Sequence, residues 1–171
     1  MKVGSGWYIE NAGVVLLHVF LPTFFRNIGL LQGNDFSSEK ARHRAIHLIK
    51  YLATKTQGLP EYELLLAKFL CGLPFDLPIQ RKVKLKKKEQ KAAEELLAAA
   101  LKHWGALGTS SPDGLREGFL QRAGKLEKRP NGWYLTIEKK TLDILLSQLP
   151  WALSMVKLPW MEEVLRVEWD S

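Results

Sequence analysis

The spacing of apolar residues changes about two-thirds of the way along the chain. In residues 39–56 apolar side chains recur at every third or fourth position, which is the period of an amphipathic helix. From residue 125 onward they alternate with polar residues, which is the period of a strand with one buried face. Helices followed by a small antiparallel sheet define the α+β class, and this is the fold that the pattern predicts.

Helices are expected at residues 14–31, 39–56, 61–71, 87–107 and 112–122. The first is almost wholly apolar and is kinked or restarted at Pro22, because proline removes a helical hydrogen bond. The second carries one apolar stripe: Ala45, Leu48, Ile49 and Leu52. Its polar positions lie away from that stripe: Lys40, His43, His47 and Lys50. The fourth carries a similar apolar stripe: Ala93, Leu96, Leu97, Ala100 and Trp104. Such stripes are the buried faces of helices.

Strands are expected at residues 6–9, 125–129, 133–138, 154–158 and 164–169, with one more helix at 141–149. Asn131-Gly132 is a strong signal for a two-residue hairpin turn. We therefore expect an antiparallel sheet drawn from residues 124–138 and 153–169. No internal repeat and no low-complexity linker divides the chain, so residues 1–171 are expected to form a single globular domain.

Three tryptophans stand nine residues apart near the end of the sequence, at Trp151, Trp160 and Trp169. Tryptophan has a large apolar surface, and its indole N–H needs a partner when it is buried. A chain end of this kind is expected to dock into the core, onto a partner, or both. We expect Trp151 and Trp160 to be largely buried, and we keep Trp160 and Trp169 as candidates for contact with a partner.

The positive charge is concentrated in one segment. Residues 81–91 hold seven cations against one acid, Glu89, whereas the formal net charge of the whole chain is +7. The simplest interpretation is a solvated loop and helix entrance. Binding to an acidic protein surface comes next, ahead of nucleic acid, because no aromatic side chain stands among the lysines to stack on bases. The candidate contacts in this segment are Lys84, Lys86, Lys87 and Lys88.

The longest apolar run, residues 12–25, is interrupted by His18 and Pro22 and is shorter than the ~20 residues that a membrane span needs. No charged leader with a small-residue cleavage site precedes it. The single cysteine, Cys71, has no partner for an internal disulfide. We therefore expect a soluble protein that folds in a reducing cytoplasm, with no contact to a membrane.

Candidate chemistry is sparse. His43 and His47 have the i, i+4 spacing of zinc proteases, but Arg44 stands where the glutamate should follow and no third ligand is evident. A solvated polar face accounts for the pair. Cys71 lies at an apolar helix end, where a buried structural thiol is expected rather than a nucleophile.

Two pairs of glutamates could in principle act as an acid and a base: Glu61 with Glu63, and Glu162 with Glu163. The first lies near a helix start, where carboxylates are favoured, and the second in a predicted turn. Neither suggests a desolvated cleft that would separate the two pKa values. The sequence thus predicts no catalytic residue, no cofactor-binding residue and no metal site.

A series of motifs runs along nearly the whole chain. They are residues 7–18, 20–22, 44–48 with 51–52, 68–74, 103–104, 114–122, 132–133, 149–151, Ser154, 158–161 and 167–169. In this order they resemble a domain found in tape measure proteins of bacterial contractile injection systems. The resemblance implies a phage-tail-like particle, in which a sheath contracts around a tube and the tape measure sets the length of that tube. It implies no catalytic residues and no cofactor.

The chain is too short to set the length of a tube by itself. Even if all 171 residues formed one helix, at ~1.5 Å per residue it would span only about 260 Å. The prolines, the hairpin and the tryptophans indicate a globular domain instead. We therefore expect a terminal domain that anchors the extended part of a tape measure protein to the hub and spike of the baseplate, with the capping end of the tube as the alternative.

The resemblance also sets the expected partners and location. Baseplate hub and spike proteins and inner tube proteins are the expected partners, and self-association in a symmetric particle is a further option. Assembly would take place in the bacterial cytoplasm, and the protein would then lie inside the particle, which can become extracellular. The rival function, from another class, is a basic nucleic-acid-binding module that acts through residues 81–91.

Overall fold

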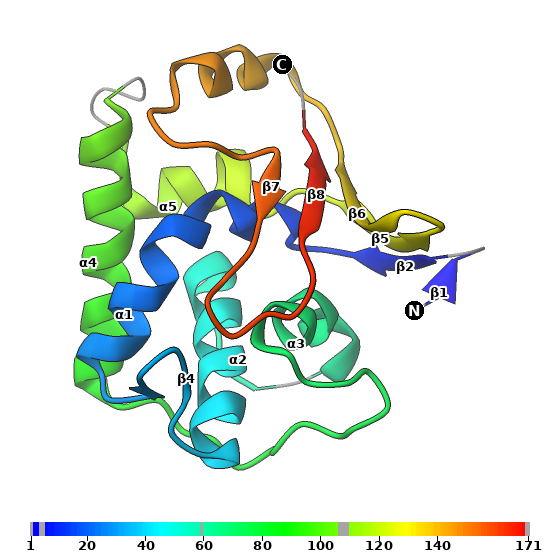
Figure 1. Cartoon of the computed structure of the whole chain (residues 1–171). Helices are drawn as coiled ribbons and strands as arrows, with labels where there is room; N and C mark the ends of the chain where they lie inside the picture. Colours follow the sequence, from blue (N-terminus) through cyan, green and yellow to red (C-terminus); the bar gives the residue numbers. More distant parts are fainter. Residues whose placement is uncertain (1, 4–5, 59, 106–109, 170–171) are drawn as a thin grey trace.

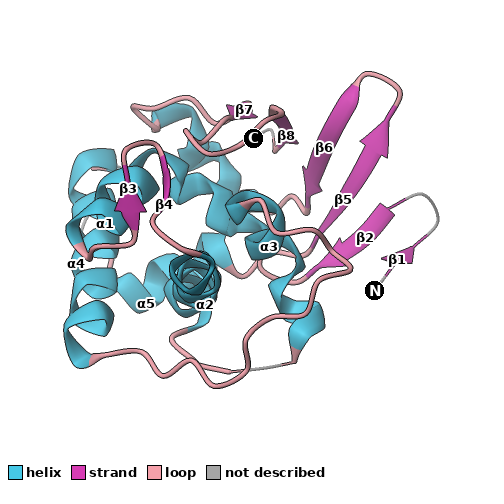
Figure 2. Ribbon diagram, turned by 60° about the horizontal axis from the view of Figure 1, so that its bottom comes forward, coloured by secondary structure: helices cyan, strands magenta, loops and turns pink. Residues whose placement is uncertain are grey.

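Helices fill most of the first 120 residues, and most of the main sheet comes from the residues that follow, as the α+β prediction requires (Figure 1). The computed structural model describes residues 2–3, 6–58, 60–105 and 110–169. Strands β2 (Gly6–Ile9), β5 (Gly124–Arg129) and β6 (Gly132–Ile137) lie on one side of the helices, and the short hairpin of β3 (Leu31–Gln32) and β4 (Asp35–Phe36) lies on the other (Figure 2).

The predicted helix at residues 14–31 is divided in two. A 3₁₀-helix, η1 (Ala12–Phe20), is followed by α1 (Leu21–Asn27), in which Pro22 occupies one of the first positions, where its missing N–H has no helical partner. The restart at Pro22 was thus predicted correctly. The helix is shorter than predicted, because residue 31 belongs to the hairpin of β3 (Leu31–Gln32) and β4 (Asp35–Phe36).

Helix α2 (Glu39–Thr54) runs through the middle of the helical part, and its apolar stripe is buried. It begins at Ser38, whose Oγ accepts a hydrogen bond from the N–H of Ala41 at 3.0 Å. The prediction of a solvated polar face was wrong for His47 and Lys50, which are only 2% and 5% exposed. The reason is tertiary: His47 contacts Gln80, in the connection that follows the next helical stretch, whereas Lys50 contacts Gly58, before that stretch, and Glu63, near its start.

That next helical stretch is η2 (Glu61–Leu64) followed by α3 (Leu65–Cys71), which ends at Gly72 with a left-handed backbone. After the connection come α4 (Lys87–Trp104), α5 (Pro112–Leu115) and a π-helical turn, η3 (Arg116–Leu120). The whole predicted stripe of α4 is buried. Residues 106–107, where we expected α4 to end, lie outside the described residues.

The main sheet has strands β1 (Lys2–Val3), β2 (Gly6–Ile9), β5 (Gly124–Arg129), β6 (Gly132–Ile137), β7 (Met155–Val156) and β8 (Leu165–Glu168). Among the described residues their order is β1-β2-β5-β6-β8-β7. The predicted hairpin at Asn131-Gly132 joins β5 to β6. The sheet is mixed rather than antiparallel, because β6 and β8 are parallel. Parallel neighbours need a crossover, and here the chain passes through the 3₁₀-helix η4 (Thr141–Gln148) and β7 between them.

A buried ion pair fastens the end of β8 to the helices. Nη2 of Arg122 lies 2.6 Å from Oδ1 of Asp143, and the two side chains are 0% and 2% exposed. The Asp143 carboxylate also accepts hydrogen bonds from the indole N–H of Trp169 at 3.1 Å and the backbone N–H of Lys140 at 3.0 Å. Burial raises the pKa of Asp143, but the hydrogen bonds and the charge of Arg122 outweigh it, so the pKa lies below its ordinary value.

Candidate docking surfaces

The two histidines of α2 hold the chain's own backbone. The N–H of Gln80 donates to Nδ1 of His43 at 2.9 Å, and Nε2 of His47 lies 2.8 Å from the carbonyl oxygen of Gln80. Burial lowers the pKa of His47. No group of histidine, cysteine and acidic side chains able to hold a metal ion occurs among the described residues. The pair therefore fixes the connection between α3 and α4 onto α2.

The other candidate chemical groups are also explained by structure. Glu61 accepts a hydrogen bond from the N–H of Ile79 at 2.5 Å, and Glu63 forms an ion pair with Lys50 at 3.3 Å. Cys71 is buried, and burial raises the pKa of its thiol. A buried thiol with a raised pKa is a poor nucleophile.

A hollow of about 540 Å³ lies between the segment that follows α3 and the segment that follows Trp160. We call it the aromatic groove. It is lined by residues from six separate stretches of the chain: Asp35, Arg42, Phe69, residues 72–75, Trp133 and residues 160–163. Only the fold brings these stretches together.

Two aromatic clusters build the walls of the aromatic groove. In the first, the rings of Phe69 and Trp133 are 5.0 Å apart, and Trp7 and Phe75 join them. In the second, the ring of Trp160 lies 4.8 Å from that of Phe36. Phe69, Phe75, Trp133 and Trp160 line the hollow and are partly buried, so part of each of these four rings is accessible there.

The rim of the aromatic groove is mostly acidic. The guanidinium of Arg42 forms ion pairs with the carboxylates of Glu39, at 2.8 Å, and Asp35, at 3.4 Å. Glu163 accepts from the indole N–H of Trp133 at 2.9 Å and lies 3.3 Å from Lys128. Glu162 is exposed and forms no ion pair with any residue in the described ranges. The aromatic groove therefore combines aromatic walls with a mostly acidic rim.

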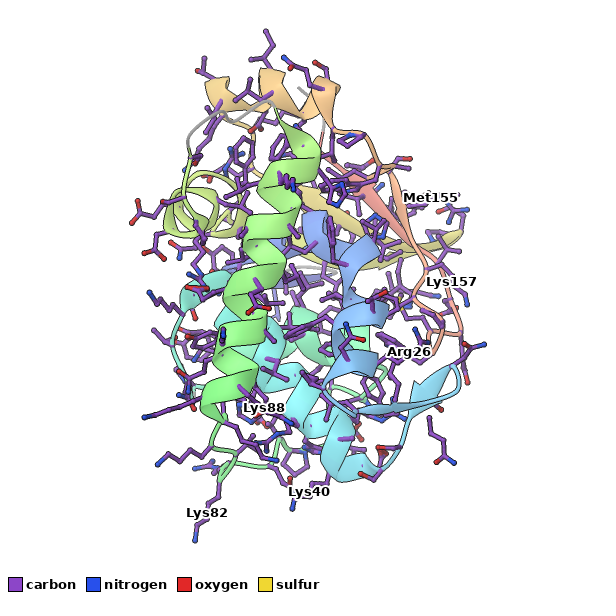
Figure 3. The ribbon with its side chains drawn as sticks, turned by 90° about the vertical axis from the view of Figure 1, so that its left-hand side faces the viewer. Arg26, Lys40, Lys82, Lys88, Met155 and Lys157 are labelled. Carbon is purple, nitrogen blue, oxygen red and sulfur yellow. The ribbon has the colours of Figure 1, made fainter. Side chains whose placement is uncertain are left out.

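The basic segment presents free side chains on a fixed backbone. Arg44 donates to the carbonyl oxygen of Lys84 at 2.8 Å, and the N–H of Leu85 donates to Gln57 at 3.0 Å. Nε of Arg44 also forms an ion pair with the carboxylate of the buried Glu89, at 2.7 Å. Lysines 84, 86, 87 and 88 are exposed. In Figure 3, Lys82 and Lys88 mark this segment at the lower end of the molecule.

The three C-terminal tryptophans have different environments. Trp169 is only 5% exposed and belongs to the ion-pair cluster, so it does not offer a surface. Trp151 and Trp160 are partly buried and pack against the hydrophobic core, in agreement with the prediction that most of each ring is buried. Their indole N–H groups donate to the carbonyl oxygens of Leu16 at 2.9 Å and Leu70 at 2.7 Å. Of the candidate tryptophan contacts, Trp160 is therefore the one that lines a hollow.

Truncation of either half-buried tryptophan should destabilise the fold. We expect Trp151→Ala and Trp160→Ala each to lower the free energy of unfolding by about 2–3 kcal/mol. Each substitution removes packing contacts with the core and a hydrogen bond to a backbone carbonyl. The loss is smaller than for a fully buried tryptophan, because part of each ring is already in contact with water. Urea denaturation of the purified variants measures this. Unchanged midpoints for both would mean that the rings contribute nothing to the fold and serve only a partner.

The described residues thus offer two accessible surfaces, the aromatic groove and the basic segment. Comparison with known families gives the particular class: the family described as contractile injection system tape measure protein matches residues 2–169. The chain therefore belongs to that family and is part of a contractile injection system. Searches of curated proteins and of solved structures gave no match. Among the described helices, none combines the length and apolar character needed to cross a membrane.

Proposed function

We propose that this chain is a non-catalytic docking domain of a tape measure protein. It attaches the length-determining part of that protein to an end component of the particle while the tube is assembled. The hub and spike of the baseplate are the proposed attachment point, and inner tube proteins are the proposed neighbours.

The observation that carries this proposal is the aromatic groove. Three of the motifs that carry the family resemblance, residues 68–74, 132–133 and 158–161, all contribute to its lining. These motifs stand far apart in the sequence, and they meet around an accessible hollow with Trp160 in its wall. Tryptophans in such hollows often dominate the binding energy of protein interfaces.

The candidate acids, bases and nucleophile support a role without chemistry, because Glu61, Glu63, His43 and His47 are committed to the chain's own groups and Cys71 is buried. The basic segment is proposed as a supplementary contact. The alternative of a nucleic-acid-binding module has weaker support, because the exposed lysines have no aromatic platform within residues 81–91.

Co-purification tests the proposal directly. We expect the tagged chain to retain the hub or spike protein from a mixture of purified particle components. Glu162→Arg, which reverses an exposed charge on the rim of the aromatic groove, should reduce the retained amount about tenfold. The matched control is Glu117→Arg, because Glu117 is also exposed but lies outside this groove. Failure of the unaltered chain to retain any end component would refute the docking proposal.

The basic segment allows a separate prediction about stability. Lys86, Lys87 and Lys88 occupy the start of α4, where the helix dipole disfavours positive charge. We expect the fourfold replacement of Lys84, Lys86, Lys87 and Lys88 by glutamine to leave the free energy of unfolding unchanged or to raise it by up to about 1 kcal/mol. Thermal denaturation measures this, with Lys102→Gln at the favourable end of α4 as the control. A clear loss of stability would show that these lysines support the fold. If assembly fails while folding is intact, the basic segment is the principal docking surface.

A further inference from the structure

A second hollow lies on another face of the molecule, between α1 and α4. It has a volume of about 450 Å³, and we call it the helix groove. Its lining comes from α1 with its flanking residues and from α4: Phe20, Thr23, Phe24, Asn27, Ile28, Lys88, Ala92, Glu95, Leu96 and Ala99. Figure 3 shows this face, with α4 in front and α1 beside it.

The lining has the spacing of two helical stripes. On α4 the stripe runs through Lys88, Ala92, Glu95 and Ala99, which are four, three and four residues apart. On the α1 side the positions are Phe20, Thr23, Phe24 and Asn27. Ala92 and Ala99 are half-buried and carry no bulk, so the two helices leave a furrow between them. A third helix packs into such a furrow with its apolar face.

The charges around the helix groove are mainly positive. Lys88 is part of its lining, and Arg26, Lys40 and Lys82 point outward on the same side of the molecule (Figure 3). None of these four cations forms an ion pair with an acidic residue that the structure describes. Glu95 is the acidic side chain among the lining residues.

The lysines at the start of α4 do not stabilise that helix, whereas Arg26 lies in the last turn of α1, where a cation is favoured, and donates to the carbonyl oxygen of Gly33 at 3.4 Å. Lys87 and Lys88 occupy the first turn of α4, where the exposed N–H groups and the helix dipole disfavour a cation. The one acid of that turn, Glu89, is buried against Arg44 and not against the lysines. Unfavourable charges that a fold retains at its surface are typical of a binding site.

We propose that the helix groove binds an acidic amphipathic helix of a partner. Its apolar face fills the furrow over Ala92 and Ala99, and its carboxylates face Lys88, Arg26 and the lysines below them. This site is separate from the aromatic groove, and the inference does not depend on the aromatic groove being a docking surface.

Synthetic peptides of about 18 residues, long enough for a helix to form on contact, are suitable probes. The acidic peptide carries leucine and alanine on one face and glutamate on the other. A second peptide has lysine in place of every glutamate. Fluorescence anisotropy of the labelled peptides should give a dissociation constant at least about tenfold lower for the acidic peptide, and the difference should shrink at high salt.

Two matched pairs of variants locate the site. Ala99→Trp fills the furrow and should weaken binding of the acidic peptide by about tenfold or more. Ala98→Trp makes the same change at an exposed neighbour on α4 outside the hollow, and should leave binding unchanged. Lys88→Glu should likewise remove the preference for the acidic peptide, while Lys102→Glu should retain it. Melting temperatures of all four variants show whether the fold is intact.

Several results would overturn the inference. One is equal affinity for the acidic and the lysine peptides, or no binding of either. Another is binding that Ala99→Trp and Lys88→Glu leave unchanged in folded protein. Capture of random duplex DNA that depends on Lys88 but not on Ala99 would make this face a polyanion site instead. Self-association that Ala99→Trp abolishes would identify a second copy as the occupant.

Discussion

Asp143→Ala should lower the free energy of unfolding by about 3–5 kcal/mol. The substitution leaves the guanidinium of Arg122 buried without its counter-charge, and it removes the acceptor for the indole N–H of Trp169. An uncompensated buried charge is among the most destabilising changes that one substitution can make. Urea denaturation followed by tryptophan fluorescence measures the effect.

Asp113→Ala is the matched control. Asp113 also pairs with a buried arginine, Arg116, at 2.8 Å, but its own side chain is 61% exposed and Arg116 keeps Glu94 as a partner at 2.5 Å. We expect a loss below about 1 kcal/mol there. A double variant, Arg122→Met with Asp143→Leu, should recover much of the lost stability, because a well-packed apolar pair can replace a buried ion pair. Equal losses for Asp143→Ala and Asp113→Ala would contradict this description of the core.

The same ion pair predicts a pH dependence. The folded-state pKa of Asp143 lies below its unfolded value of about 3.9, so its contribution is complete above that pH and is lost as the pH falls through the folded-state pKa. Unfolding free energies measured from about pH 6 to about pH 2 should fall less steeply in Asp143→Asn than in the unaltered chain.

Gly13→Ala should also be strongly destabilising, with a loss in the free energy of unfolding of about 3 kcal/mol or more. A Cβ at residue 13 would lie 1.7 Å from the carbonyl oxygen of Phe119, because η1 and η3 pack backbone against backbone there. Both segments would have to separate, and the neighbouring hydrogen bond from the N–H of Ala12 to the carbonyl oxygen of Arg122, at 2.8 Å, would be strained.

Gly118→Ala is the control for this change. Its nearest neighbour would be Cδ2 of Leu142 at 3.2 Å, the end of a flexible side chain that can move. We expect a change within about 1 kcal/mol, since alanine also favours helical backbone. Thermal denaturation of both variants separates the cases, and a Gly13→Ala protein as stable as Gly118→Ala would mean that the packing of η1 on η3 is wrong.

Local pattern predicted the local parts of this fold. The stripes of α2 and α4 and the hairpin at Asn131-Gly132 depend on neighbours within a few residues, so the sequence was sufficient for them. The parallel pairing of β6 with β8 depends on the path taken through η4 and β7, which no periodicity encodes. The burial of His47 and Lys50 likewise depends on residues outside α2: Gln80 for His47, and Gly58 and Glu63 for Lys50.

The candidate sites were predictable only in part. The lysines of the basic segment are exposed, as a charged run suggests. Residue type alone could not predict which tryptophans are buried and which are accessible, because Trp169 lies in the core whereas Trp160 lines a hollow. The aromatic groove joins six separate stretches, so its only signal in the sequence was the set of motifs around residues 72–74, 133 and 160.

The central claim is that this domain attaches a tape measure protein to an end component of the particle. Electron microscopy of particles from cells that carry an in-frame deletion of the domain, together with the protein composition of those particles, tests it most directly. The account predicts a loss of complete particles, or tubes of uncontrolled length that lack the tape measure protein. Particles of normal length, number and composition would contradict it.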